Sequence, residues 1–285
     1  MDVNKLKLTG VEHLSSLAQI SSPPIELFWA GQSIDTWIYR PKVGIVGSRK
    51  ITPYGQAVTA KIAGALSQAG VVVISGLAYG VDVSAHRAVL SANGLTVAVL
   101  GTSIEDIYPA AHAHVAEQIA IHGTLVSEYP AGTPGFPSNF IARNRLISGL
   151  SDVLLITEAA VNSGSLHTAR FALEQGKTVM AVPGNITSPM SEGANNLIKS
   201  GAVPVTSADD VFFALKLDVA KQRRLKFNGS QSERRLLECI REGITAQEEL
   251  ATAANLDGAQ LSSALTMLEL EGLIRPAGGG QWLSA

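Results

Sequence analysis

The sequence predicts an α/β protein: a doubly wound, mostly parallel Rossmann-like sheet with a small C-terminal winged-helix domain. Two observations predict the sheet. Short runs rich in Val, Ile and Leu recur from residue 43 onward, and Ala-rich stretches with helical spacing separate most of them. A third observation predicts the second domain, because the composition changes after about residue 215 and the chain ends in a Gly-rich segment.

The apolar runs show no alternation with polar residues, which is typical of strands buried on both faces of a parallel sheet. The predicted strands are residues 43–47, 71–75, 95–100, 124–128, 153–157, 178–182 and 202–206. Helical patterns lie between them, at residues 56–68, 81–92 and 166–175. This alternation of strand and helix predicts a doubly wound core over residues 41–215.

The two ends of the chain differ from this core. Residues 1–40 are too few for a hydrophobic core of their own, and we expect a short N-terminal extension, the remnant of a helical domain. Residues 216–230 form a basic linker with five Lys or Arg and one acidic residue. Residues 231–285 predict three helices, at 232–241, 246–253 and 259–271, and a Gly-rich hairpin at 272–282, which is a winged-helix pattern.

Composition limits the function classes. Of the 285 residues, 46% are hydrophobic, which excludes a largely disordered chain. No apolar stretch approaches the roughly 20 residues of a membrane-spanning helix, and no signal peptide is visible. The single cysteine, Cys239, cannot form an intrachain disulfide, so we expect a cytoplasmic protein. The net charge is −2, from 22 basic and 24 acidic residues, and a nucleic-acid site would therefore be a local patch.

The loops that follow the predicted strands are rich in glycine and small polar residues. Examples are Gly47-Ser48-Arg49, residues 75–82, residues 162–165 and residues 183–185. In an open parallel sheet these loops lie together at the carboxyl ends of the strands, where ligands bind. Glycine lets the backbone of these loops come close to an anion, and the small polar side chains add hydrogen-bond donors, which favours a phosphate-bearing ligand. Glycine is, however, common in such turns of any α/β domain.

Familiar cofactor motifs are missing. Arg49 interrupts any G-x-G-x-x-G pattern after the first strand, and Phe171 stands where the P-loop ending in Gly176-Lys177-Thr178 would need its first glycine. His112 and His114 lie only two residues apart, without a cluster of further ligands. We therefore expect no cofactor and no metal.

Residues 138–147, SNFIARNRLI, predict a helix with Ser138 or Asn139 as its N-cap. Phe140 and Arg143 are three residues apart and share a face, whereas Arg145 lies about 200° around the helix from Arg143. One arginine could then reach a phosphate while the other holds neighbouring loops, and Phe140 could stack on a base. The alternative places Phe140 in the core and both arginines in solvent.

Several long blocks resemble the DNA-processing protein A (DprA/Smf) family. They are VGIVGSRKITPYG from residue 43, SGLAYGVD from residue 75, SEYPAGTPGFPSNFIARNRLISGLS from residue 127, TEAAVNSGSLHTARFALEQGK from residue 157 and VPGNITSPMSEGANNLIKSGA from residue 182. The resemblance covers roughly residues 20–215, and the end of the chain is similar to the winged-helix domain that many members carry. Tyr79 and Ala142 depart from the family pattern, which often has basic residues at these positions.

This resemblance implies a cytoplasmic, non-catalytic protein that binds single-stranded DNA, forms a homodimer and helps to load the RecA recombinase during natural transformation. It implies that the core contacts DNA with residues of three blocks. These residues are Gly47, Ser48 and Arg49, then Phe140, Arg143, Asn144 and Arg145, and also Lys199.

Two other function classes remain open. A LOG-like nucleotide hydrolase shares the sheet and the phosphate loops, but it depends on a PGGxGTxxE pattern, and NSGSLHTARFALE lacks the paired glycines. A regulator could bind duplex DNA through the winged helix, but residues 259–271 contain no Lys or Arg, so this domain fits protein contact better.

Overall fold

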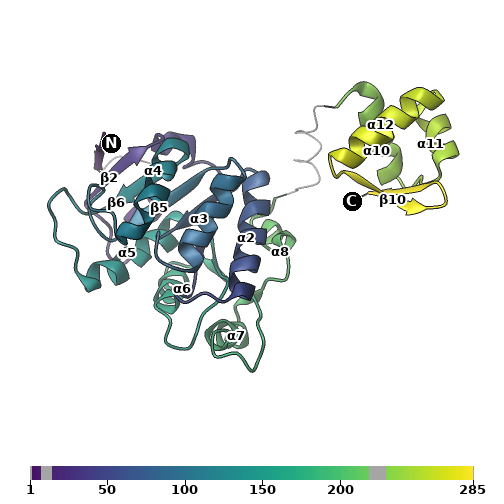
Figure 1. Ribbon diagram of the computed structural model, residues 1–285. Helices are drawn as coiled ribbons and strands as arrows, with labels where there is room; N and C mark the ends of the chain where they lie inside the picture. The colour runs from purple at the N-terminus through teal and green to yellow at the C-terminus, as the bar shows by residue number, and fades with distance from the viewer. Residues whose placement is uncertain (1, 8–14, 218–228, 285) are drawn as a thin grey trace. The chain divides into compact units, whose positions relative to one another are not determined.

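The computed structural model describes residues 2–7, 15–217 and 229–284. The chain divides into two compact units, Met1–Val219 and Ala220–Ala285, and we describe each by itself (Figure 1). Among the described residues, no helix is long and apolar enough to cross a membrane.

The first unit is built on a nine-stranded sheet with the order β1-β2-β6-β5-β4-β3-β7-β8-β9. The strands are β1 (Asn4–Lys7), β2 (Glu26–Gly31), β3 (Lys42–Val46), β4 (Val72–Ser75), β5 (Thr96–Leu100), β6 (Thr124–Ser127), β7 (Val153–Ile156), β8 (Thr178–Ala181) and β9 (Val203–Pro204). The seven strands from β6 to β9 in this order are parallel, whereas β1 and β2 pair antiparallel. The predicted α/β class is confirmed.

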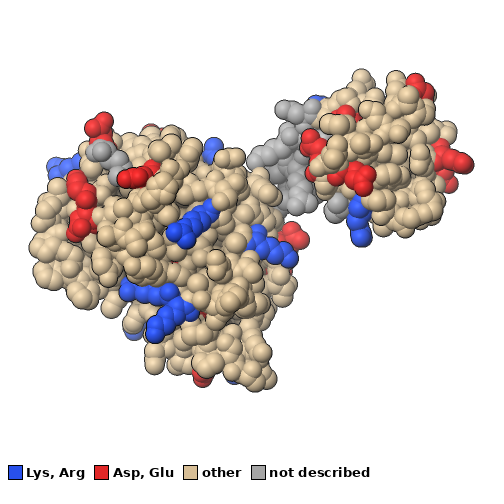
Figure 2. All heavy atoms as spheres, viewed as in Figure 1, with Lys and Arg blue, Asp and Glu red and all other residues tan. Residues whose placement is uncertain are grey.

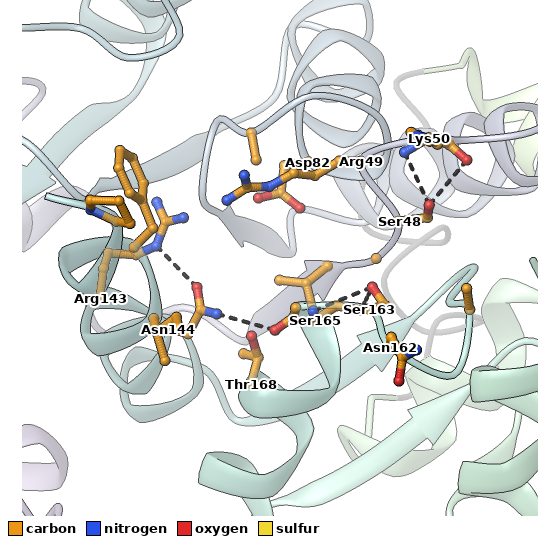
Figure 3. A pocket seen from close by; sticks show the side chains of 18 of the residues that line it. Ser48, Arg49, Lys50, Asp82, Arg143, Asn144, Asn162, Ser163, Ser165 and Thr168 are labelled. Carbon is orange, nitrogen blue, oxygen red and sulfur yellow. Dashed lines mark hydrogen bonds between the residues drawn. The ribbon is translucent and has the colours of Figure 1, made fainter. Parts of the chain in front are cut away.

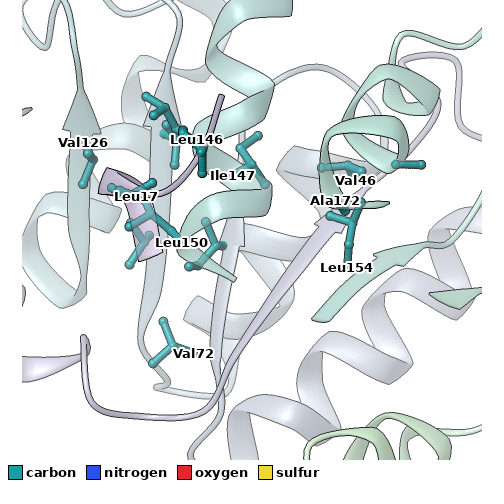
Figure 4. Packing of buried hydrophobic residues seen from close by; sticks show 14 of the residues in the cluster. Leu17, Val46, Val72, Val126, Leu146, Ile147, Leu150, Leu154 and Ala172 are labelled. Atoms are coloured by element: carbon teal, nitrogen blue, oxygen red, sulfur yellow. The ribbon is translucent and has the colours of Figure 1, made fainter. Parts of the chain in front are cut away.

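Helices cover both faces of the sheet (Figure 1). They are α1 (Ser15–Ala18), α2 (Pro53–Gln68), α3 (Val81–Ser91), α4 (Ala113–His122), α5 (Pro137–Leu150), α6 (Ser165–Glu174), α7 (Glu192–Lys199) and α8 (Ala208–Ala214). Successive residues of β3 point to opposite faces of the sheet. Ile45 packs in the hydrophobic cluster under α2 and α3, and Val46 packs in the hydrophobic cluster under α5 and α6. Figure 4 shows this second cluster, in which Leu146 and Ile147 of α5 are buried.

Residues before 40 contribute two strands to the sheet. Strand β2 pairs with β6, and Leu27 of β2 is buried in the cluster under α5. Trp37 is also buried, and its Nε1 donates a hydrogen bond to Thr124 Oγ1 at 3.0 Å. The segment therefore adds β1 and β2 to one edge of the sheet, and it also contains the short helix α1 and a single 3-10 turn at Ile34–Thr36.

The start of α5 also differs from the prediction. Neither Ser138 nor Asn139 is the N-cap, because the helix begins at Pro137 and Phe136 takes the cap position without a side-chain hydrogen bond. Proline suits the first helical position, since its fixed φ is helical and its missing N–H would have no partner there.

The second unit confirms the predicted winged helix. Helices α10 (Gln231–Arg241), α11 (Gln247–Ala254) and α12 (Gly258–Leu270) precede the antiparallel hairpin of β10 (Ile274–Gly278) and β11 (Gln281–Ser284). Capping boxes begin α10 at Ser230 and α12 at Asp257. Residues 229–284 carry four arginines and eight acidic residues, a charge of −4, and Figure 2 shows acidic side chains on this unit.

We predict that Leu27→Ala lowers the free energy of unfolding by about 2–5 kcal/mol, because it opens a cavity in the core. Leu27 is 1% exposed. Ile25→Ala, at a position 86% exposed just before the same strand, should change stability by less than about 0.5 kcal/mol. Urea denaturation followed by circular dichroism measures both. Equal effects of the two substitutions would contradict the burial of β2.

Candidate nucleic-acid interface

A cavity of about 630 Å³ lies at the carboxyl ends of β3 and β7 (Figure 3). Strands β4, β5 and β6 follow β3 to one side, and β7, β8 and β9 lie on the other, so the strand order reverses between β3 and β7. Such a reversal separates the loops on either side and leaves a crevice, the usual ligand site of doubly wound sheets.

Gly47 and Ser48 form the loop after β3. A Cβ atom on Gly47 would lie 2.5 Å from Val81 Cγ2, so glycine permits the close approach of α3. Ser48 is buried, and its amide N–H donates to Glu158 O at 2.7 Å. Its hydroxyl accepts from Lys50 N and donates to Lys50 O, both at 3.0 Å. These two residues line the cavity, and their hydrogen bonds fix the shape of the loop.

Arg49 and Lys50 extend from this fixed loop. Both are exposed and both line the cavity. Across the described ranges, no carboxylate lies within 4.0 Å of either charged group. The sequence reasoning selected Arg49 and missed Lys50, although the second cation of GSRK was visible.

Arg143 also lines the cavity, on the same side of α5 as Phe140, as the spacing predicts. Its side chain is 3% exposed, and its Nη1 donates to Gly76 O at 2.7 Å and to Val99 O. Burial lowers the pKa of Arg143 to about 10, and nearby Asp82 opposes this shift. The guanidinium therefore ties the ends of β4 and β5 together.

Two of the predicted DNA contacts lie outside the cavity lining. Arg145 pairs with Glu128 through two hydrogen bonds, at 3.0 and 2.6 Å, and its Nε donates to Ser22 O at 2.8 Å. It thus holds neighbouring loops, one of the two roles that the helix spacing predicts. Lys199 is exposed at the end of α7. Neither residue is among those that line the cavity.

An aromatic pair forms another part of the wall. The rings of Phe140 and Tyr108 lie 5.0 Å apart between centroids, at an angle of 52°. Phe140 is half-buried, and a Cβ atom on Gly101 would lie 2.7 Å from its ring. Tyr108 is 52% exposed and lines the cavity, so it offers more of its ring than Phe140. The sequence reasoning missed Tyr108.

The remaining wall is the loop before α6 and the start of that helix. Asn162, Ser163 and Ser165 line the cavity there, and the hydroxyls of the two serines lie 2.8 Å apart. Asn144 of α5 bridges to this loop, because it accepts from Arg143 Nε at 3.2 Å and donates to Gly164 O at 3.5 Å. A helix N-terminus favours an anion, and α6 directs its N-terminus at the cavity.

Helix α2, by contrast, has an internal anion at its N-terminus. The carboxylate of Glu158 accepts a hydrogen bond from Thr52 N at 2.8 Å and from the Thr52 hydroxyl at 2.5 Å. Glu158 is buried. A carboxylate of the protein itself thus lies at the N-terminus of α2, the helix that follows the first strand of the core.

The described residues contain no group of three His, Cys, Asp or Glu side chains that could hold a metal ion. The arrangement in the cavity is instead two unpaired cations, an aromatic pair and a helix N-terminus. Cations and amide donors bind phosphate, and an exposed ring can stack on a base.

Comparison with known proteins identifies the family. Residues 8–216 match the family described as DNA recombination-mediator protein A, and residues 220–280 match the DprA winged-helix domain. The chain is 38% identical to protein Smf of Escherichia coli over 84% of its own length and 67% of that protein. It is 37% identical to a DprA protein of Mycobacterium tuberculosis over 84% of its own length, and this spans 63% of the relative.

Solved structures agree with the sequence matches. DNA processing protein A of Streptococcus pneumoniae superimposes with a TM-score of 0.68 and 34% identity, over 75% of this chain and 74% of that chain. The protein of the same name from Helicobacter pylori, studied for its single-stranded DNA binding mode, gives a TM-score of 0.68 and 30% identity, over 76% and 96% of the two chains. The chain belongs to the DNA recombination-mediator protein A family and ends in a DprA winged-helix domain.

Proposed function

We propose that the core binds single-stranded DNA in the cavity at the carboxyl ends of β3 and β7. The observation that carries the proposal is the placement of two exposed, unpaired cations, Arg49 and Lys50, beside the exposed ring of Tyr108. The Helicobacter pylori relative, which shares the fold, binds single-stranded DNA and supports the same ligand here.

The geometry fits a strand whose bases are unpaired. Phosphate groups bind to Arg49, to Lys50 and at the N-terminus of α6, and a base stacks on the pair of Tyr108 and Phe140. A duplex hides its bases in the stack, so it could use the cations but not the rings. Since none of these contacts reads a base edge, binding is largely independent of nucleotide sequence.

We further propose that the DNA-bound protein acts as a homodimeric mediator that helps to load RecA during transformation, as the family resemblance implies. The proposal assigns residues 41–215 to DNA, 216–230 to a linker and 231–285 to protein contact. Support for the last assignment is the −4 charge of residues 229–284 and the absence of Lys and Arg from α12. No catalytic step is assigned, since buried Glu158 is engaged by Thr52.

We predict that Arg49→Ala weakens binding of an oligothymidylate about 4-fold at roughly 0.15 M salt. The reason is the loss of one phosphate contact, which lowers the slope of log K against log salt by about 0.7. Arg87→Ala removes another exposed arginine, outside the cavity lining, and serves as the control. Fluorescence anisotropy at several salt concentrations measures both. The proposal fails if the two variants have equal slopes, or if duplex binds as tightly as single strands.

We predict that Tyr108→Ala weakens binding by about 1–3 kcal/mol without changing the salt slope, because a stacked ring contributes no charge. Tyr108→Phe keeps the ring and should bind like the unmodified protein. The same anisotropy titrations test both variants. Normal affinity of Tyr108→Ala would remove this residue from the interface.

We predict that Arg143→Leu acts through stability. Removing the guanidinium takes the donor from the buried carbonyls of Gly76 and Val99, and it removes one of the two cations, with Arg49, whose charges act on buried Asp82. Breaking a buried charged arrangement of this kind costs about 3–5 kcal/mol of unfolding free energy. Arg87→Leu, at an exposed position, should cost less than about 0.5 kcal/mol. Thermal melts compare the two, and unchanged melting of Arg143→Leu would contradict a structural role.

A further inference from the structure

A second hollow, of about 390 Å³, lies at the amino ends of β3, β7 and β8, at the opposite edge of the sheet from the cavity. We call it the amino-edge groove. The residues of its lining that matter here are Tyr39, Arg40, Lys42, Asp152, Thr178 and Lys216.

Lys42 forms the floor of the amino-edge groove. Its side chain is 12% exposed, and its Nζ donates to Ile38 O at 2.8 Å and to Arg40 O at 2.9 Å. Asp152 lies 3.7 Å from this ammonium group, and its carboxylate also accepts from Lys42 N at 2.8 Å. Burial lowers the pKa of Lys42, and Asp152 opposes this shift. Lys177 is half-buried and immediately precedes Thr178 of the lining, so it lies at the border of the groove.

Three cations around this floor have no acidic partner. Across the described ranges, no carboxylate lies within 4.0 Å of the charged groups of Arg40, Lys177 or Lys216. Asp152 is the one acid among the described residues of the lining, and Lys42 engages it. The groove therefore carries an excess of positive charge in a chain whose net charge is −2.

Tyr39 adds an aromatic surface among these cations. Its side chain is 64% exposed and lines the groove. The cations come from three separate segments, before β3, before β8 and after α8. Cations distributed around an exposed ring are the combination with which proteins hold a single strand, whereas a small inorganic anion needs no ring.

We propose that the amino-edge groove is a second contact surface for single-stranded nucleic acid, in which Arg40 and Lys216 of the lining, with Lys177 at its border, bind phosphates of the backbone. The proposal rests on the proposed function only for the identity of the ligand. Strands of four or five residues separate the two edges by about 15 Å of sheet, and more with the loops. A short oligonucleotide therefore fills one site, and a longer one reaches both.

The test combines two variants and two oligothymidylates, of about 5 and about 25 nucleotides, which bracket common single-strand site sizes. One variant carries Arg40→Gln, Lys177→Gln and Lys216→Gln. The control carries Lys7→Gln, Lys61→Gln and Arg87→Gln, which changes the net charge equally at exposed positions outside both sites. Circular dichroism melts establish that both variants are folded.

For the 25-mer we expect the groove variant to lower the slope of log K against log salt by about 2, and to weaken binding by up to about 50-fold at roughly 0.15 M salt. Its affinity for the 5-mer should stay within about twofold, because the short strand binds beside Arg49. The control should retain the 25-mer affinity to within about threefold.

Three results would overturn the proposal: no loss with the groove variant, an equal loss with the control, or polyglutamate bound as tightly and lost with the same substitutions. The last would identify the groove as a surface for acidic protein. Arg49→Ala separates the two sites. If Arg49→Ala weakens binding of the 5-mer and the groove variant leaves binding of the 25-mer unchanged, the cavity binds DNA and the groove does not. If Arg49→Ala leaves binding of the 5-mer unchanged and the groove variant weakens binding of the 25-mer, the groove binds DNA and the cavity does not.

Discussion

The buried guanidinium of Arg143 is the interaction on which the candidate interface depends. Moving a charge into the protein interior is costly unless hydrogen bonds and an opposite charge compensate it. Here the carbonyls of Gly76 and Val99 accept its hydrogen bonds, and Asp82 lies nearby. Because these groups sit at the ends of β4 and β5, one side chain fixes two loops of the cavity and the first turns of α5. Asn144 and Phe140 take their positions from that anchored helix.

The same crevice shows how a fold selects among its helix N-termini. Parallel strands with crossover helices direct several N-termini at one edge of the sheet, and each can attract an anion. At α2 the anion is the protein's own carboxylate, since Glu158 accepts both hydrogen bonds of Thr52. At α6 the groups beside the helix N-terminus are neutral serine hydroxyls, which bond to each other at 2.8 Å, and Ser163 Oγ also accepts from Ser165 N at 3.4 Å.

Local sequence patterns predicted the parallel strands and most of the helices, because buried strands and amphipathic helices carry their own periodicity. They did not predict β1 and β2, which lie outside the alternation of strand and helix: β2 pairs antiparallel with distant β6, and β1 pairs with β2. The helix spacing placed Phe140 and Arg143 on one face, but it could not tell what that face meets. The partners of Arg143 lie 67 and 44 residues away in sequence, and Ser22, which Arg145 contacts, lies 123 residues away. Tyr108 was missed because no local motif surrounds it.

A protein with a net charge of −2 needs, at the place where a polyanion binds, cationic side chains that do not pair with carboxylates of the protein. In the core, carboxylates engage Lys5, Lys42, Arg145 and Arg170. Arg49 and Lys50 at one edge of the sheet, and Arg40, Lys177 and Lys216 at the other, have no such partner among the described residues. Since exposed pairs contribute little to stability, leaving these five cations without a carboxylate partner costs the fold little and leaves their positive field at the surface. Distribution of the charge, more than its sum, therefore determines which surfaces of this chain can meet nucleic acid.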